Sequence, residues 1–467
     1  MRLLIFGTGL YYKNRKQAFI NDEIIAFVDN DESKRKKTLD GCPIISPLEI
    51  NSMEYDYICL MAKGEFVEQM RLQLEQLRVP YERIVDFFEF GMINNGAKLS
   101  FYYGKKCTFS GIKKVLLLSH ELSYSGAPLV LFYVARILRK RGYSVTVLSL
   151  KDGELRMDFI NEGVIVGIQE DNRRFDPFLN EWMQQFDLVW GNTVTYYYWI
   201  STFNRSGKPF IWWLHESFEA YEWLGAERMP KKVEKNINIY AVGKLALAAA
   251  RKYIPDANMK SLLYGAPDFC SDVNTIKPRE NEGKVIFGII GTLCPRKAQD
   301  IFLDAIELLA KEERKKAEFW IIGNVLNESY FDAIKTRMEL IEEIKILGSF
   351  NRQEMRQIYS DLDVIVCPSR EDPMPVVVTE AMIMSKPSIV SDMTGTVSLI
   401  EEKVNGLVCK NEDPLDLAEK MRWVLNNQKC LTEIGKNARL LYEENFSMDI
   451  FEKNINIIVN RALNLTQ

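Results

Sequence analysis

Short apolar segments alternate with longer amphipathic segments along most of the chain. The N-terminal part reads RLLIFGTG, then EIIAFVDND, then YDYICLMA, with polar stretches of helical character between them. Each apolar run has the length of a strand, and the first ends in a glycine turn, so residues 1–90 are predicted to form a doubly wound α/β unit of the mononucleotide-binding type. Residues 91–112 are rich in Gly, Asn, Lys and Ser without clear periodicity, which predicts a linker.

Two further units with the same alternation follow. KKVLLLSH predicts a strand, ELSYSGAP a glycine turn and LVLFYVARILRKRG a helix, and later strands carry this unit over residues 113–277. The polar stretch SDVNTIKPRENEG marks a boundary, and KVIFGIIGTL opens a third unit over residues 278–467. Its strands are apolar on both faces, which indicates parallel strands covered by helices. The predicted fold class is therefore α/β, with three consecutive doubly wound parallel-sheet units.

Charge and cysteine usage exclude several classes of protein. The 467 residues carry 60 basic and 64 acidic side chains, a balance that argues against a dedicated nucleic-acid-binding protein. The eight cysteines are scattered with no C-x-x-C pair, so neither a disulfide framework nor a metal site is predicted. No apolar run approaches the roughly 18 residues of a membrane span. We expect a cytoplasmic protein, and a peripheral position at the inner membrane face stays open.

Polar residues gather where the strands of the second and third units are predicted to end, which is where parallel sheets bind ligands. In the second unit these residues are His120, Glu121, Ser125, Gly126, Asn192, Thr193, His215 and Glu216. In the third unit they are Thr292, Arg296, Lys297, Gly323, Gly348, Ser369, Arg370, Glu371 and Asp372. His215 stands out because WWLHES ends an apolar strand with polar groups, although a structural role for a lone histidine remains an alternative.

The stretch CPSREDPMPVVVTEAM, residues 367–382, holds acidic residues on both sides of an apolar run. Pro375 suits the first position of a helix that extends to Ser385, so Asp372 precedes the helix and Glu380 lies more than one turn inside it. The free amides of the first turn would then sit between two carboxylates, an arrangement that suits a phosphate flanked by sugar hydroxyls. Arg296 and Lys297 supply positive charge for the same phosphate. The alternative is a polar loop beside a solvated pair of cations.

A second candidate site lies in the N-terminal unit. Gly7 and Gly9 form a G-x-G turn, and Asp29 ends the next strand about 20 residues later, where a carboxylate commonly meets a ribose hydroxyl. Tyr12 stands where the third glycine of such a turn is expected. The unit therefore either binds a nucleotide or keeps the fold without the ligand.

The motifs of the second and third units resemble those of a known family. SREDPMPVVVTEAMIMSKPSIVSD, GTLCPRKAQDIFLDAI and the NGLV turn at Asn405 and Gly406 are similar to the retaining glycosyltransferases of family 4, which have the GT-B fold. SYSGAPLVLFYVA resembles the glycine loop of that family, and YGAPD resembles its turn before the second domain. The resemblance runs from Lys113 to the C-terminus. It implies an acceptor-side domain over 113–277, a nucleotide-sugar donor domain over 278–467, a central cleft, a last helix that crosses back, and an additional Rossmann-like domain at the N-terminus.

The resemblance also implies roles for individual residues. The E-x7-E pair of the family falls on Asp372 and Glu380, so that Glu380 binds the ribose of the donor and Asp372 binds hydroxyls of its sugar. Lys297 matches the lysine that contacts the diphosphate, and His215 matches a histidine near the sugar ring. The residues implied to bind the donor are Gly126, Lys297, Glu371, Asp372, Met374, Pro375, Val376 and Glu380, and those implied in catalysis are Arg296, Lys297, Asp372 and His215.

This sequence departs from the family pattern at three positions. The first acid is Asp372, one methylene shorter than Glu, with Glu371 adjacent as a substitute. Pro375 replaces a usual glycine and removes one amide donor. Thr292 stands where the family has an arginine, so charge stabilisation shifts to Arg296. These departures affect the choice of donor sugar more than the type of reaction.

The implied function is a retaining, metal-independent, hexosyltransferase-like enzyme that moves a sugar from a nucleotide diphosphate sugar to an acceptor hydroxyl. The nucleotide sugar is the donor substrate, and no cofactor is implied. The expected acceptors are a glycan, a lipid-linked group or a protein, in the assembly of cell-surface polysaccharide, glycolipid or glycoprotein glycans. The N-terminal domain is expected to dock other glycan-assembly enzymes. Two alternatives are a non-catalytic partner or acceptor-binding subunit of the same fold, and a dehydrogenase that uses the G-x-G turn.

Overall fold

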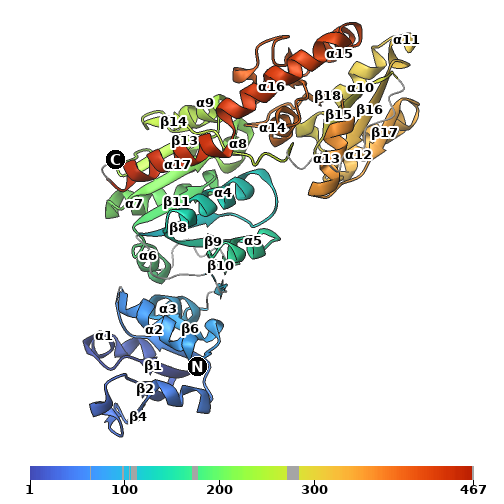
Figure 1. Ribbon diagram of the computed structural model, residues 1–467. Coiled ribbons are helices and arrows are strands. Elements are labelled where there is room, and N and C mark those ends of the chain that lie inside the picture. Colours follow the sequence, from blue (N-terminus) through green and yellow to red (C-terminus); the bar gives the residue numbers. More distant parts are fainter. Residues whose placement is uncertain are drawn as a thin grey trace. The chain divides into compact units, whose positions relative to one another are not determined.

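The computed structural model describes residues 1–63, 65–96, 99–104, 106, 113–170, 177–270 and 283–464, and these residues form three β-sheets (Figure 1). The chain divides into two compact units. Unit 1 comprises Met1–Trp212, Val233–Asn238 and Asn460–Gln467, and unit 2 comprises Trp213–Lys232 and Ile239–Val459. The predicted α/β class with three parallel-sheet units is confirmed. The boundary predicted near residue 277 lies outside the described residues.

The N-terminal sheet, blue in Figure 1, has six strands in the order β3-β4-β2-β1-β5-β6, and only the short β3 is antiparallel to its neighbour. Its strands are β1 (Arg2–Phe6), β2 (Glu23–Val28), β3 (Thr38–Leu39), β4 (Cys42–Ile45), β5 (Tyr57–Leu60) and β6 (Ile84–Asp86). Its helices are α1 (Leu10–Lys13), α2 (Glu65–Gln76) and α3 (Phe87–Asn94).

Both faces of the N-terminal sheet are buried. Leu3 and Ile5 pack in one apolar cluster, whereas Leu4 and Phe6, which point to the opposite face, pack in another. This period-2 alternation follows from strand geometry, and fully burying one such side chain stabilises the fold by about 1.5 to 3 kcal/mol. The apolar runs of the sequence therefore form covered strands, as parallel sheets require.

The stretch 91–112, predicted as a linker, contains regular structure. Helix α3 ends at Asn94, and β7 (Leu99–Tyr102) pairs antiparallel with β10 (Ile165–Gln169). Residues 97–98, 105 and 107–112 lie outside the described residues. The described part of this stretch thus adds a strand to the edge of the second sheet, which a search for periodicity in four residues could not detect.

A buried charged group lies at the start of α3. Asp86 caps the helix by accepting from the amides of Phe88 and Glu89 at 2.8 and 2.9 Å. The Arg71 guanidinium pairs with the Glu89 carboxylate at 2.5 Å, and both side chains are almost fully buried. Burial and the nearby charge of Glu89 together raise the pKa of Asp86 to about 7, against the opposing effect of Arg71. The folded state therefore binds a proton at Asp86 more strongly than the unfolded state does.

Asp86→Asn is expected to reduce the pH dependence of stability. Because the folded-state pKa of Asp86 lies above its unfolded value of 3.8, its contribution to stability falls as the pH rises from about 4 to about 7. Asparagine can still cap α3 but carries no charge, so the variant should gain stability relative to wild type at pH 8 and gain little at pH 4. A gain of about 1 kcal/mol moves Tm by about 2 to 4 °C. Thermal melts across this pH range test the expectation, with Asp413→Asn, a change at the N-cap of α15 (Pro414–Asn426), as the matched control. Equal gains at both pH values would contradict it.

The second sheet has eight strands in the order β14-β13-β12-β11-β8-β9-β10-β7. Its further strands are β8 (Lys114–Ser119), β9 (Ser144–Ser149), β11 (Leu188–Asn192), β12 (Phe210–Leu214), β13 (Ile237–Ala241) and β14 (Met259–Ser261). The helices of this region are α4 (Gly126–Lys140), α5 (Leu155–Asn161), α6 (Pro177–Met183), α7 (Ile200–Ser206), α8 (Phe218–Leu224) and α9 (Lys244–Tyr253).

The third sheet, in unit 2, has six parallel strands in the order β17-β16-β15-β18-β19-β20. The strands are β15 (Val285–Ile290), β16 (Ala317–Ile322), β17 (Ile344–Leu347), β18 (Val364–Cys367), β19 (Ser388–Ser391) and β20 (Leu407–Cys409). The helices are α10 (Gln299–Glu307), α11 (Lys311–Arg314), α12 (Glu328–Glu339), α13 (Arg352–Asp361), α14 (Val376–Ile383), α15, α16 (Leu431–Asn445) and α17 (Met448–Ala462).

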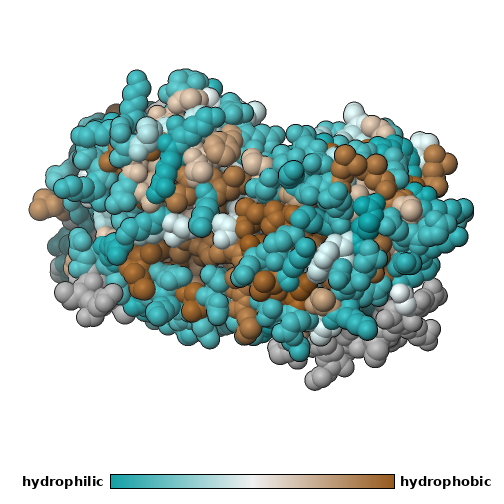
Figure 2. Space-filling view, turned by 90° about the horizontal axis from the view of Figure 1, so that it is seen from above, coloured by the Kyte–Doolittle hydropathy of each residue, from teal (hydrophilic) through white to brown (hydrophobic). Residues whose placement is uncertain are grey.

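The face of the molecule drawn in Figure 2 is predominantly polar at its edges, and apolar residues gather towards its middle. Hydrophilic residues cover most of the face in Figure 2, with apolar residues among them, as on most folded proteins. None of the helices in the described ranges combines the length and the hydrophobicity that a membrane-spanning helix needs.

Candidate functional site

The loops after β15 and β18 meet at a buried carboxylate in unit 2. Lys297 Nζ donates to Asp372 Oδ2 at 2.7 Å, and Arg296 Nη1 donates to the same oxygen at 3.3 Å. The Asp372 side chain is 8% exposed and that of Lys297 16%, whereas that of Arg296 is 40% exposed. The three charged residues that the sequence analysis selected from two separate segments thus form one cluster.

This cluster keeps Asp372 ionised. Burial by itself would raise the pKa of Asp372, but the charges of Lys297 and Arg296, with a hydrogen bond from the Met374 amide, outweigh it and hold the pKa below its ordinary value. Lys297, Arg296 and the Met374 amide were all predicted to contact the donor. In the structure these three groups contact Asp372. A bound donor would therefore have to replace Asp372 as their partner.

Backbone contacts determine the position of the Asp372 loop. The Asp372 amide donates to Met393 O at 3.1 Å, and the Gly395 amide donates to Asp372 O at 2.8 Å. A Cβ at Gly395 would lie 1.7 Å from the carbonyl oxygen of Pro373, so only glycine allows this approach. The loop is therefore held in place before any ligand binds, as an electrostatic site requires.

Gly395→Ala is expected to displace the loop and to reduce turnover strongly while unit 2 stays folded. The added methyl group cannot occupy the same space as Pro373 O, so the peptide must move and carry Asp372 away from Lys297. Leu340→Ala is the control, because Leu340 is 77% exposed and is not one of the strand-end residues of the candidate site. Steady-state assays and thermal melts of both variants test this, and equal activity of the two would count against a fixed loop.

Arg370 ties the two loops together. Its amide donates to Arg296 O at 2.9 Å, and its guanidinium donates to Asp300 Oδ2 at 2.7 Å and to Glu412 Oε1 at 2.8 Å. The guanidinium of Arg370 is therefore a structural clamp engaged by Asp300 and Glu412, although its place after β18 made it a candidate ligand contact.

Helix α14 begins at Val376, with Pro375 as its N-cap instead of its first residue as predicted. The side chain of proline offers no acceptor, so the N-cap residue makes no side-chain hydrogen bond to this N-terminus. Glu380 lies on the helix as predicted, and the Tyr359 hydroxyl donates to its Oε2 at 2.6 Å. The Tyr264 and Thr379 hydroxyls are joined at 2.7 Å, so both Thr379 and Glu380 are held by buried tyrosines.

Glu371 and His215 have contacts that their predicted roles did not anticipate. Glu371 Oε1 accepts from the amide of Glu219, in the first turn of α8, at 3.3 Å. The His215 amide donates to Glu216 Oε2 at 2.9 Å, and its ring lies 4.4 Å from the Trp213 ring. Glu371 thus caps a helix, and it joins the segment that carries His215 to the Asp372 loop within unit 2.

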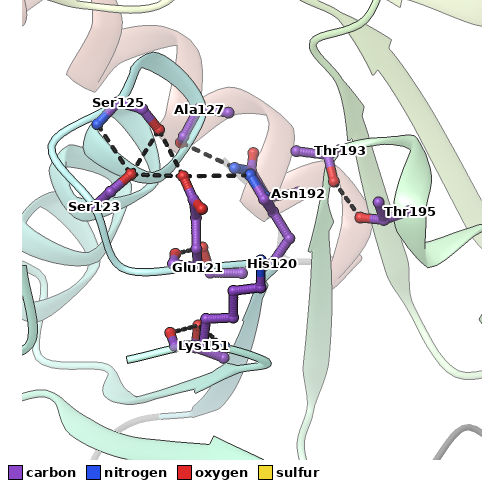
Figure 3. A network of polar contacts seen from close by, with 11 residues as sticks. His120, Glu121, Ser123, Ser125, Ala127, Lys151, Asn192, Thr193 and Thr195 are labelled. Carbon is purple, nitrogen blue, oxygen red and sulfur yellow. Dashed lines mark hydrogen bonds and ion pairs between the residues drawn. The ribbon is translucent and has the colours of Figure 1, made fainter. Parts of the chain in front are cut away.

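The glycine loop of the second sheet lies in unit 1. Gly126 is the first residue of α4, and Ser125 is its N-cap. The Ser125 hydroxyl donates to Glu121 at 3.1 Å and so does not cap the helix (Figure 3). The phosphate contact expected of Gly126 stays a prediction.

The first glycine of the N-terminal G-x-G turn has a positive φ angle. Gly7 has a φ of 112°, which favours glycine. Asp29 accepts from the Thr8 hydroxyl, from the Asp31 amide at 2.9 Å and from Lys34 Nζ at 2.9 Å. Burial opposes ionisation, but these contacts lower the pKa of Asp29. A ribose at Asp29 would have to compete with Lys34 for the carboxylate. Gly9 is followed by α1, a helix of only four residues. Nucleotide binding by Gly7, Gly9 and Asp29 stays a hypothesis.

Sequence reasoning missed the residues that support the site. These residues are Tyr359, Tyr264 and Gly395, which lie more than 20 positions from the residues that they contact. Tyr264 stands in the YGAPD segment, but that segment does not predict its contact with Thr379. The local sequence offered one signal for these supporting residues, a glycine after β19. It predicts a turn but does not indicate which residue the glycine contacts.

Two family models cover most of the second and third sheets. Residues 111–240 match the model for glycosyl-transferase family 4, and residues 272–441 match the model for glycosyl transferases group 1. Residues 1–85 match a separate model, described as C2185-like, N-terminal.

Curated relatives are distant. An uncharacterized glycosyltransferase of Haemophilus influenzae is 22% identical over 343 residues, which cover 69% of this chain and 93% of that protein. N,N'-diacetylbacillosaminyl-diphospho-undecaprenol alpha-1,3-N-acetylgalactosaminyltransferase of Campylobacter jejuni is 32% identical over 114 residues, 24% of this chain and 28% of that protein. The chain spans 44% and 46% of the lengths of two uncharacterized glycosyltransferases of Methanocaldococcus jannaschii, at 28% and 26% identity over 34% and 39% of this chain.

Solved structures show the same fold. Anabaena HepE in complex with UDP has a TM-score of 0.64 at 18% identity, covering 74% of this chain and 100% of that one. WaaG, a glycosyltransferase involved in lipopolysaccharide biosynthesis, has a TM-score of 0.56 at 16% identity, over 74% of this chain and 99% of that one.

The parallel sheets and the polar ends of their strands thus define an α/β protein of the GT-B class. The chain belongs to the family 4 glycosyltransferases and carries an additional N-terminal domain with a family model of its own.

Proposed function

We propose that the protein transfers a sugar from a nucleotide diphosphate sugar to an acceptor hydroxyl, with retention at the anomeric carbon and without a bound divalent metal. The observation that supports this most is the buried Asp372 carboxylate, which Lys297 and Arg296 neutralise directly before a helix N-terminus whose N-cap residue makes no side-chain hydrogen bond. An anionic diphosphate can take over both cations, and the freed carboxylate can accept hydrogen bonds from sugar hydroxyls.

The donor provides a partner for each of these groups. In the proposed complex Lys297 and Arg296 bind the diphosphate, the first amides of α14 face its charge, and Glu380 binds the ribose hydroxyls. The bond between the anomeric carbon and the diphosphate oxygen breaks, and a bond to the acceptor oxygen forms on the same face. The acceptor proton passes to the departing diphosphate. The fixed cations stabilise the charge that develops on the leaving group.

The proposed acceptor is a glycan or a lipid-linked saccharide in cell-surface glycan assembly, reached at the inner membrane face. The support is the name of the Campylobacter relative, which specifies a diphospho-undecaprenol acceptor. For residues 1–90 we propose an accessory role in docking other assembly enzymes. The pairing of Asp29 with Lys34 argues only against the alternative, a ribose bound at Asp29.

The test is release of nucleoside diphosphate from UDP-, GDP-, ADP- and dTDP-sugars by the full chain in the presence of EDTA, with and without an extract of lipid-linked saccharides. Turnover of one donor would support the proposal, and the anomeric configuration of the product, read by NMR, decides retention. If no donor turns over and calorimetry detects no donor binding, the result favours the alternative that the protein is a non-catalytic partner or acceptor-binding subunit. If turnover occurs only with added Mg²⁺, the metal-independent part is wrong.

A further inference from the structure

Unit 1 contains a groove of about 1100 Å³ outside both candidate sites. Its walls include Met1, which precedes β1, Tyr57, which begins β5, and Arg83, which precedes β6. The groove thus lies at the amino ends of these strands, whereas the G-x-G turn lies at the carboxyl end of β1. Small ligands of parallel sheets bind at the carboxyl ends, so the position of this groove indicates an occupant of another kind.

The groove runs along the free edge of β7, and we call it the β7 groove. All five residues from Leu99 to Tyr103 line it, and successive residues of a strand point to opposite faces, so the edge of the strand must face the groove. β7 is the last strand of the second sheet, and beyond its ladder with β10 its backbone forms no hydrogen bond within the described residues. In such a strand every second residue turns its N–H and C=O outwards. The β7 groove therefore contains backbone donors and acceptors that can bind a ligand.

The opposite wall of the β7 groove is the edge of β6. Ile84 and Val85 both line the groove, although they pack into apolar clusters on opposite faces of the N-terminal sheet. This edge is already covered, because Arg71 Nη1 donates to Ile84 O at 3.1 Å. The sequence of β7, LSFY, lacks the charged residues and prolines that protect edge strands. Of the two edges, β7 is therefore the one that can pair with an additional strand.

The spacing of the backbone groups along β7 fits a polypeptide. An extended chain offers one donor and one acceptor per residue at a rise of about 3.3 Å, which matches the edge of β7, whereas the hydroxyls of a glycan have no such repeat. Addition of a strand to a free sheet edge is a recurring mode of peptide recognition. The groove also suits apolar side chains, because Met157 is 54% exposed and the stacked rings of Tyr81 and Tyr103, with centres 4.6 Å apart, border it.

The charged residues of the β7 groove favour a basic segment. The Met1 amine pairs with Asp22 at 2.9 Å, and the Arg83 guanidinium lies 5.7 Å from the centre of the Tyr55 ring. Glu82 is exposed and forms no ion pair within the described residues. These positive charges thus have partners while the charge of Glu82 has none, so a lysine or arginine of the ligand would complement it.

We propose that the β7 groove binds an extended segment of another glycan-assembly protein. The segment adds a strand of about four residues, the length of β7, to the free edge and places a basic residue near Glu82. Its other residues are β-branched or aromatic, since these favour a strand and suit the apolar walls. This assignment rests on the docking role proposed for residues 1–90 and is independent of the transfer reaction.

The test uses the full chain to select from a display library of random short peptides. Wild type should enrich peptides in which β-branched or aromatic residues accompany a lysine or arginine. Ser100→Pro should enrich none of them, because proline removes a donor from the edge or breaks the pairing with β10. For the strongest peptide, Glu82→Lys should raise the Kd about fivefold. Glu32→Lys, which changes another exposed acid of the N-terminal domain that does not line the groove, is the matched control.

Two measurements distinguish a backbone ladder from binding through side chains alone. N-methylation of the peptide should weaken binding about fivefold at every second residue and little at the residues between, because only alternate amides face β7. Hydrogen–deuterium exchange of the full chain should slow at Leu99–Tyr102 when the peptide binds. Equal effects of N-methylation at all positions, or unchanged exchange at β7, would overturn the inference.

Other occupants of the β7 groove give different results. The inference is overturned if wild type enriches no peptide, or if Ser100→Pro abolishes binding of cellopentaose or chitopentaose, or dimerisation in ultracentrifugation, instead of peptide binding. Thermal melts show whether Ser100→Pro folds, and if it does not, Glu82→Lys and the N-methylated peptides still decide. Peptides that bind wild type and a folded Ser100→Pro equally would refute the groove but keep the docking role, so the two failures are distinguishable.

Discussion

Lys297→Met is expected to lower kcat about 100- to 1,000-fold, the loss measured when one preorganised donor to a developing negative charge is removed. Lys297 is nearly buried and holds Asp372 at 2.7 Å, so its amine is already in position and partly desolvated. Methionine keeps the length and the apolar stem of the side chain but has no charge to offer a departing diphosphate. Steady-state kinetics with the identified donor provide the measurement.

The same substitution has a second, separable effect on stability. Removing one partner of a buried pair typically costs about 3 to 5 kcal/mol, and the cost should be smaller here because Arg296 still contacts Asp372 at 3.3 Å. The pKa of Asp372, now held low by Lys297 and Arg296, should rise in the variant. A lowered folded-state pKa contributes stability that is present at neutral pH and lost as the pH falls through the folded pKa, so the variant should lose less stability on acidification than wild type does.

A double variant separates these two effects. In Lys297→Met/Asp372→Asn no buried carboxylate remains without its lysine, and Arg296, which also loses Asp372, has a 40% exposed side chain that water can solvate, so stability should recover while turnover stays low. Lys345→Met, which removes an exposed lysine that pairs with the partly buried Glu318 in the same unit, is the control for loss of a lysine and should change kcat little. If Lys297→Met keeps more than about a third of the wild-type kcat while folded, Lys297 is not the diphosphate partner.

Glu380→Gln is expected to raise the donor KM about 10- to 100-fold, with a smaller effect on kcat. A carboxylate that accepts from ribose hydroxyls makes charge-assisted hydrogen bonds worth about 1.5 to 3 kcal/mol, and glutamine retains the shape without the charge. The ribose does not change during transfer, so its contacts act equally on the ground state and the transition state. Calorimetry with the nucleoside diphosphate and initial-rate kinetics measure the two effects.

Two further substitutions test whether the rise in donor KM comes from the charge of Glu380. Tyr359→Phe removes the 2.6 Å bond that orients Glu380 but leaves the charge, so its effect on the donor KM should be weaker, about fivefold for a bond of about 1 kcal/mol. Glu339→Gln changes an exposed acid on α12 and should have no effect. A loss of kcat without a change in donor affinity in Glu380→Gln would place this carboxylate at the reacting bond instead of the ribose.

The described sheets and their order of appearance could be predicted because the information is local. Leu3, Leu4, Ile5 and Phe6 are apolar in succession, and a strand with both faces buried is the structure that such a run satisfies. The edge strand β7 could not be predicted in the same way. Its pairing with β10 depends on residues more than 60 positions away, and the four residues of β7 carry too short a pattern.

The features of the candidate site also divide into those that local sequence could predict and those that depend on the tertiary structure. Asp372, Glu380, Arg296 and Lys297 could be selected because strand ends, a helix start and charged side chains are readable in order along the chain. That Lys297 and Arg296 meet on one oxygen of Asp372 depends on two loops that adjoining strands bring together.

The sequence by itself determined the fold class, the family and the residues that carry charge at the strand ends, because periodicity and motif spacing are properties of neighbouring residues. The tertiary structure alone decided which groups already have partners. It assigned Glu371 to the cap of α8, Arg370 to Asp300, Lys34 to Asp29 and Tyr359 to Glu380. A buried charge must be compensated by whatever lies next to it in space, and residues distant in sequence become neighbours only when the sheets have formed.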